Sequence, residues 1–90
     1  MSQAIVNPAD LRHFAQHLKQ FNGDLRERIA LLRAQMNGLG DTWRDQEHAK
    51  FVQEFELTMN AIEAFVETSD EHIPFLLRKA ERIDDYLNQH

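Results

Sequence analysis

Apolar residues recur every three or four positions along two long stretches of this 90-residue chain. This spacing predicts two amphipathic helices, over about residues 8–37 and about residues 43–89. Arg28 and Gln35 interrupt a strict seven-residue repeat in the first helix, so we interpret its apolar stripe as one that drifts around a 3.6-residue helix. The stripe comprises Leu11, Phe14, Leu18, Phe21, Leu25, Leu32 and Leu39, with Ile29 and Met36 displaced by one position.

The second helix carries more apolar surface than one hairpin can cover. Ser69 is the only polar member of its stripe, which comprises Val52, Phe55, Met59, Ile62, Val66, Ile73, Leu76, Ala80, Ile83 and Leu87. A further apolar line, Phe51, Phe65 and Tyr86, runs beside this stripe, and it predicts another covering surface. The predicted fold is all-α: residues 1–90 form one antiparallel helix–turn–helix hairpin that dimerises into a four-helix bundle. We expect the dimer interface to include Phe51, Phe55, Phe65 and Tyr86.

The turn between the helices is predicted at residues 38–42. Gly38 and Gly40 would end the first helix, and Asp41 or Thr42 would cap the second. Trp43, the only tryptophan in the chain, follows directly. It has two compatible interpretations: an aromatic cap that closes the end of the bundle, and a recognition element offered to a partner protein.

Three other positions shape the predicted helices. Asn7 followed by Pro8 is a favourable helix start, with Asn7 as the N-cap. Gly23 costs roughly 1 kcal/mol inside a helix relative to Ala and marks a local weakness or a close helix crossing. Pro74 interrupts the helical hydrogen bonding, but the apolar pattern continues across it, so we expect a kink, with a break as the alternative.

The length of the first helix sets how much of the second it can cover. Its 30 or so residues span roughly 45 Å at 1.5 Å each. Folding back from the turn, this helix would reach about residues 70–74 of the second. We therefore expect residues 75–89 to lack an intramolecular partner and to pack on a partner subunit or dock on another protein.

Composition excludes several classes of partner. The net charge of -5 disfavours nucleic acid and anionic membrane surfaces, both of which attract clustered Lys and Arg. The chain has no cysteine and no apolar run long enough to span a membrane. Residues 1–6 show no cleavable signal peptide, so export would need a route for folded proteins. A core of this size is marginal, which also favours a partner.

No constellation typical of catalysis occurs in the sequence, so we predict a protein that is not an enzyme and holds no cofactor or metal. His13 and His17 have the spacing of a metal-binding pair but lack a third ligand, and a metal-binding bundle is only a minor alternative. There is no catalytic-elbow motif and no phosphate-binding loop. An acidic stretch of the second helix is expected to be a solvated face; it comprises Glu63, Glu67, Asp70 and Glu71.

The sequence resembles the WXG family, small helical hairpins of type VII secretion that include the early secreted antigenic target-like proteins. The family is named for a Trp-x-Gly turn at mid-chain, usually with Phe eight residues after the Trp; Trp43 and Phe51 have this spacing. The resemblance covers about residues 8–89 and includes two departures. Asp45 stands at the position of the family glycine. Tyr86 is followed four residues later by His90, where the family's tail signal has an acid.

The resemblance implies a secretion substrate or carrier without catalytic activity. Gly40, Trp43 and Asp45 would mark the turn, and Tyr86 would be the remnant of the export signal. The implied partners are a second copy or a related small helical protein, and a secretion ATPase or co-exported protein. The chain would be cytoplasmic before export and secreted without a cleavable signal peptide. The alternative is a cytoplasmic helical adaptor or chaperone that binds a partner protein through its second helix.

Overall fold

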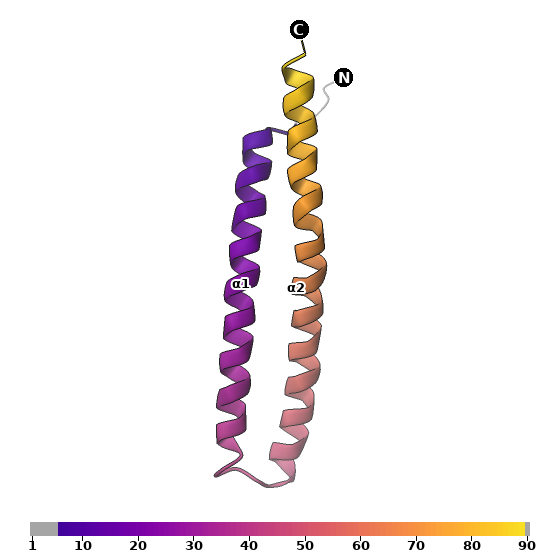
Figure 1. Ribbon diagram of the computed structural model, residues 1–90. Coiled ribbons are helices and arrows are strands. Elements are labelled where there is room, and N and C mark those ends of the chain that lie inside the picture. Colours follow the sequence, from indigo (N-terminus) through magenta and orange to yellow (C-terminus); the bar gives the residue numbers. More distant parts are fainter. Residues whose placement is uncertain (1–5, 90) are drawn as a thin grey trace.

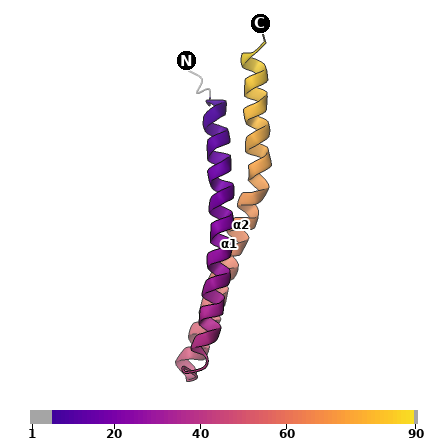
Figure 2. The same cartoon turned by 60° about the vertical axis from the view of Figure 1, so that its left-hand side comes forward.

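The computed structural model describes residues 6–89 and consists of two long antiparallel helices lying side by side (Figures 1 and 2). Helix α1 runs from Pro8 to Leu39 and helix α2 from Gln46 to Leu87. No strand occurs in this part of the chain. The predicted all-α hairpin is therefore confirmed, although α1 ends two residues later and α2 begins three residues later than the predicted bounds.

Helix α1 begins where the sequence indicates but ends differently. The Asn7 side chain accepts a hydrogen bond of 2.8 Å from the backbone N–H of Ala9, with Pro8 as the first helical residue. At the other end Gly38 lies inside the helix, and Gly40 has right-handed backbone angles (φ -61°, ψ -16°). The predicted stop is thus confirmed at Gly40, which is the C-cap of α1, and wrong for Gly38. The helix ends in tight turns, in which the N–H of Gly40 donates to the carbonyl of Asn37 at 3.2 Å.

Helix α2 is capped by Asp45 and not by Asp41 or Thr42. The N–H groups of Thr42 and Trp43 both donate to the carbonyl of Leu39, at 3.1 and 2.8 Å. These bonds keep the chain folded against the end of α1, so the next helix starts only after Asp45. The Asp45 carboxylate accepts from the N–H of His48 at 2.9 Å.

The core of the hairpin follows a strict seven-residue repeat on both helices, as in a coiled coil. Its buried residues are Ala15, Asn22, Ile29 and Met36 on α1, and Met59, Val66, Ile73 and Ala80 on α2, with Ser69 beside them. The predicted drift of the α1 stripe is therefore wrong, because Asn22 is a polar member of the repeat and conceals it. Phe14 and Phe21, placed in the predicted stripe, are 56% and 53% exposed.

The two helices remain paired well beyond Pro74. Arg26 pairs with Asp70, and Arg12 pairs with Asp84, so each step back along α1 is matched by an equal step forward along α2. Ala80 is fully buried. The expectation that residues 75–89 lack an intramolecular partner is thus wrong, because α1 is longer and α2 starts later than predicted. Helix α2 continues through Pro74 without a break.

The hairpin is an elongated rod with a large surface. It measures 70 × 25 × 16 Å and has a radius of gyration of 20.3 Å, whereas a compact domain of this length would have about 12 Å. Its accessible surface is 7306 Å²; a compact monomer of 10.6 kDa exposes only about 5,500 Å². The rod therefore has an excess of surface that association with another protein could bury.

Gly23 is not a close helix crossing, since a Cβ built there meets no heavy atom within 4 Å. We predict that Gly23→Ala stabilises the hairpin by roughly 1 kcal/mol, because Ala loses less backbone entropy in a helix. A thermal melt followed by circular dichroism would show the rise. Gly40→Ala is the comparison: its Cβ would lie 3.2 Å from the carbonyl oxygen of Asn37, so no gain is expected there. A lowered midpoint for Gly23→Ala would contradict the prediction.

Candidate partner-binding face and turn

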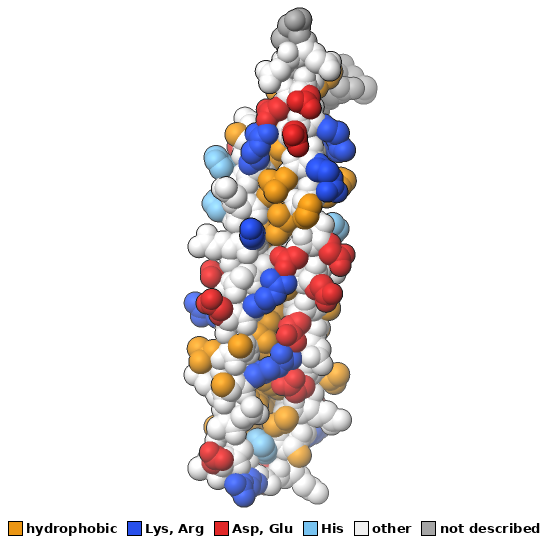
Figure 3. Space-filling view, in the orientation of Figure 1, with side chains coloured by type: hydrophobic (Ala, Val, Ile, Leu, Met, Phe, Trp, Pro, Cys, Tyr) orange, Lys and Arg blue, Asp and Glu red, His pale blue; other side chains and the backbone are white. Residues whose placement is uncertain are grey.

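One side of the hairpin is a seam of ion pairs between the helices (Figure 3). Basic residues recur every seven positions on α1, and acidic residues occupy the matching repeat on α2 except at Leu77. The basic residues are Arg12, Lys19, Arg26 and Arg33; the acidic ones are Glu56, Glu63, Asp70 and Asp84. Glu63, Glu67 and Glu71 are exposed, as predicted for a solvated acidic face, whereas Asp70 is half-buried. Glu63 and Asp70 also pair across the seam, which was not predicted. The two matching seven-residue repeats are a signal that could have revealed the seam from the sequence.

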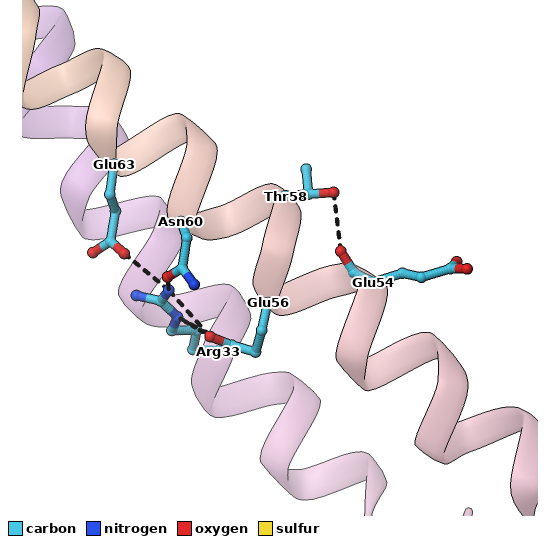
Figure 4. A network of polar contacts seen from close by, with 6 residues as sticks. All are labelled: Arg33, Glu54, Glu56, Thr58, Asn60 and Glu63. Carbon is cyan, nitrogen blue, oxygen red and sulfur yellow. Dashed lines mark hydrogen bonds and ion pairs between the residues drawn. The ribbon is translucent and has the colours of Figure 1, made fainter.

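Arg33 binds three side chains of α2 (Figure 4). Its Nη2 lies 2.9 Å from Glu63 and 3.1 Å from Asn60, and its Nε donates to Glu56 at 3.2 Å. The hydrogen bonds to Glu63 and Glu56 raise the pKa of Arg33, and the bond from Arg33 lowers the pKa of Glu63. Because these groups are partly solvent-exposed, each pair contributes only modestly to stability.

Asp70 links the seam to the core. It accepts a hydrogen bond of 2.9 Å from Asn22 Nδ2 and a second bond from Arg26. Both bonds lower the pKa of Asp70, and the bond from Asn22 has the larger effect. The charge of Lys19 makes a smaller contribution in the same direction. Asn22 is fully buried, and its Oδ1 has no hydrogen-bond partner. A buried amide held by a carboxylate is a feature that fixes register.

Acid should therefore weaken the hairpin. The pKa values of Glu63 and Asp70 are lower in the fold than their ordinary values of 4.5 and 3.8. A depressed pKa contributes stability that is fully present above the ordinary value and is lost as pH falls through the folded value. We expect a flat thermal midpoint from pH 8 to about 5 and a decline below about pH 4.5.

A variant comparison can assign this decline to the seam. Asp70→Asn should lower the midpoint at pH 7 and reduce its loss at pH 3. Glu67→Gln removes a neighbouring exposed acid that makes no ion pair in residues 6–89, and it should keep the wild-type profile. Thermal melts across this pH range provide the measurement. If the thermal midpoints of wild type and Asp70→Asn fall equally in acid, the decline does not come from the seam.

The opposite side of the hairpin carries large exposed aromatic side chains. In a seven-residue repeat, the positions that flank the core lie on opposite edges, and one edge here is the ion-pair seam. The other edge holds the residues that directly precede core positions. We call this surface the apolar face: Phe14, Phe21, Phe51, Phe65 and Tyr86, which are 56%, 53%, 45%, 56% and 69% exposed. Five large aromatic side chains so exposed along one edge are typical of a protein-binding surface.

A groove of about 430 Å³ lies at the turn end of the apolar face and involves both helices. Its lining is Leu32, Gln35, Met36, Leu39, Phe51 and Phe55. Phe51 and Phe55 have ring centroids 6.3 Å apart, so the structure brings together two of the four predicted interface residues. Phe65 and Tyr86 lie further along the same face of α2. The α1 members of the face, Phe14 and Phe21, were missed because the sequence placed them in the core.

The turn residues extend this aromatic surface. The Trp43 ring, which is half-buried, lies 4.9 Å from the ring of His48 and 5.9 Å from that of Phe51, centroid to centroid. Trp43 therefore connects the turn to the groove through Phe51. Asp45 has φ -84° and ψ -176°, an extended conformation that any residue adopts. The backbone at the position of the family glycine thus accepts Asp, which there serves as the cap of α2.

The other residues singled out in the sequence do not come together into a site. His13 and His17 are exposed on α1, and residues 6–89 contain no group of three or more side chains able to hold a metal ion. Tyr86 is exposed in the last turn of α2, and His90 lies outside the described residues. Within the described chain, neither helix is long and apolar enough to cross a membrane.

The fold defines a small helical-hairpin protein. Residues 3–86 match the WXG100 family, described as "Proteins of 100 residues with WXG". The chain belongs to this family, a class of small helical proteins that are not enzymes. No curated protein matches the sequence.

Solved structures of the secreted protein EsxB from Bacillus anthracis strain Sterne have the same fold. A proline-to-alanine mutant of EsxB superposes with a TM-score of 0.83 at 23% identity, over 96% of this chain and 100% of that one. The selenomethionine-labelled EsxB gives a TM-score of 0.77 at 24% identity, over 98% of this chain and 100% of that one. The likeness extends over nearly the full length of both chains, including the long α2.

Proposed function

We propose that this chain is a substrate or carrier of a type VII secretion system that acts through protein–protein contacts. Its membership in the WXG100 family and its uncovered apolar face support this role. The similarity to EsxB, a secreted protein, agrees with it. In this proposal the chain is made in the cytoplasm and leaves the cell folded.

The proposal includes a dimer in which two apolar faces meet to form an antiparallel four-helix bundle. Phe51, Phe55, Phe65 and Tyr86 are the proposed contacts on α2, joined by Phe14 and Phe21 of α1. The partner is a second copy or a related small hairpin. A stable interface of standard size buries about 800 Å² on each partner, well within the roughly 1,800 Å² by which the surface of this rod exceeds that of a compact monomer.

We propose that the export machinery recognises two elements of the chain. Gly40, Trp43 and Asp45 form the turn motif, with Trp43 presented beside the groove. Tyr86, exposed near the end of α2, is the proposed remnant of the tail signal read by a secretion ATPase. Because the acid of that signal is replaced by His90, a co-exported partner would supply the missing part.

Export can be tested directly with a tagged chain. We expect the tagged chain to appear in the culture medium of its host. When the type VII secretion ATPase is deleted, we expect the tagged chain to be retained in the cell. A cytoplasmic marker protein controls for lysis. Retention of the wild-type chain in both strains would overturn the secretion proposal and favour the alternative, a cytoplasmic helical adaptor or chaperone.

Trp43→Ala separates recognition from folding. Trp43 is half-buried, so its truncation should cost less than about 2 kcal/mol, below the roughly 3–5 kcal/mol typical of a fully buried Trp. We expect the variant to fold but to be retained in the cell, whereas Lys50→Ala, an exposed neighbour, is exported normally. Thermal melts and the secretion assay provide the two readouts. Normal export of Trp43→Ala would contradict a recognition role.

A further inference from the structure

The ion-pair seam has a gap at Lys19. This residue occupies the basic position of α1 between Arg12 and Arg26, and the matching position of α2, between Asp70 and Asp84, is Leu77. Among residues 6–89, no carboxylate lies within ion-pair distance of Lys19. The seam therefore lacks one acid, and the Lys19 ammonium group makes no ion pair within residues 6–89.

A groove of about 540 Å³ is located at this gap. Lys19 and Arg26 form its basic rim, Asp70 lies beside them as its one acidic residue, and Ile73, Pro74 and Leu77 supply its apolar wall. Leu77 is 41% exposed, although the other members of its repeat are acids. Apolar side chains lie open among the basic ones on this face (Figure 3).

Gly23 also lines the groove. It has no side chain, and the space where a Cβ would lie is open to at least 4 Å. The glycine thus leaves room between Lys19 and Arg26 at the point where the seam lacks a carboxylate.

The charge of the groove indicates what it binds. Asp70 pairs with Arg26 and also lies within the influence of the charge of Lys19. Because the groove holds two cations and one carboxylate, it keeps a net positive charge within a chain of net charge -5. A cation at the edge of an apolar wall favours a ligand that combines a carboxylate with an apolar side chain. The carboxylate would restore the missing ion pair, and the apolar group would cover Leu77.

We propose that this groove is a docking site for a segment of a partner protein in which Glu or Asp stands next to a large apolar residue. The site is on the seam side of the hairpin and faces away from the apolar face. It therefore stays accessible when the apolar face is covered, and it does not depend on the proposed dimer or on export.

The test uses the full-length, isotope-labelled chain and two peptide probes, acetyl-Leu-Glu-Leu-amide and its matched control acetyl-Leu-Gln-Leu-amide. Amide NMR spectra should show saturable shifts at Lys19, Gly23 and Leu77 with the Glu peptide, with a dissociation constant on the order of 1 mM for so short a probe. The Gln peptide should bind at least about tenfold more weakly, because it carries no charge.

Leu77→Glu is the decisive variant, because it places the missing carboxylate opposite Lys19 within the chain itself. It should fold normally by circular dichroism and bind the Glu peptide at least about tenfold more weakly, as should Lys19→Gln. Lys50→Gln, which removes an exposed lysine elsewhere on α2, should bind like wild type. Equal binding of the two peptides, no saturable shift, or undiminished binding by Leu77→Glu would overturn the proposal.

Light scattering of Leu77→Glu distinguishes a second copy from another protein as occupant. An unchanged mass supports a separate partner. A mass that falls relative to wild type means that the groove holds a second copy of this chain, and it overturns the proposed partner.

Discussion

Phe65→Asp is expected to raise the dissociation constant of the proposed dimer by roughly ten- to a hundredfold. Phe65 is 56% exposed in the hairpin and lies on the apolar face. Burying a Phe side chain contributes roughly 1.5–3 kcal/mol, and each 1.4 kcal/mol or so corresponds to a factor of ten. The new carboxylate adds a desolvation penalty in the same direction. Light scattering or sedimentation over a micromolar concentration series would measure the change.

Leu57→Asp is the matched control for this variant. Leu57 is 67% exposed on α2 but belongs to neither the apolar face nor the ion-pair seam. Leu57→Asp adds the same charge to the same helix as Phe65→Asp but lies outside the proposed interface. The mass measured by light scattering should therefore equal that of wild type. A monomeric mass for the wild-type chain at micromolar concentration, without a related hairpin that binds it, would contradict the dimer. Equal effects of the two substitutions would contradict the assigned face.

The architecture was predictable because its determinants are local. Two amphipathic stretches, Asn7 before Pro8 as a helix start, and a glycine-containing connection are sufficient to specify a hairpin. The excess of aromatic residues on the second helix also predicted a surface left uncovered by the fold. Phe51, Phe65 and Tyr86 lie on that surface because they share one position of the seven-residue repeat.

The core of α1 was not predictable from hydrophobicity alone. Asn22 is fully buried, whereas the neighbouring Phe21 is more hydrophobic and yet exposed. The amide is accommodated because Asp70, a residue distant in sequence, accepts its hydrogen bond. A core predicted from hydrophobicity alone therefore includes Phe14 and Phe21 and misses the seven-residue repeat that contains Asn22.

The ion-pair seam and the cap of α2 were missed for a related reason. The seam depends on pairings between residues far apart in sequence, and the cap depends on backbone hydrogen bonds at the turn. Each helix alone shows an ordinary run of charged residues, and only their alignment reveals the seam. At the turn, Asp45 was read as a departure from the family glycine. Its extended backbone and its bond to His48 show that the residue caps α2, a role for which Asp is well suited.

Asn22→Leu is expected to raise the thermal midpoint of the chain by roughly 5–15 °C. The substitution removes a buried carbonyl oxygen that has no hydrogen-bond partner, which costs about 1–3 kcal/mol, and it buries an apolar side chain worth roughly 1.5–3 kcal/mol. The lost bond to Asp70 offsets about 1.5–3 kcal/mol of this gain. A net gain of about 1–2 kcal/mol corresponds to the predicted shift for a domain of this size.

The same substitution should loosen the alignment of the helices, because a buried polar residue at a core position selects one register. The chain has no cysteine, so spin labels at cysteines introduced in place of His13 and Asp85 report the distance between the helices directly. We expect one narrow distance distribution for wild type and a broader or second distribution for Asn22→Leu. Ile29→Leu, a volume-conserving change at another core position of α1, should alter neither the midpoint nor the distribution. If Asn22→Leu melts below wild type, the bond between Asn22 and Asp70 outweighs the burial of the amide, and Asn22 is a source of stability and not only of register.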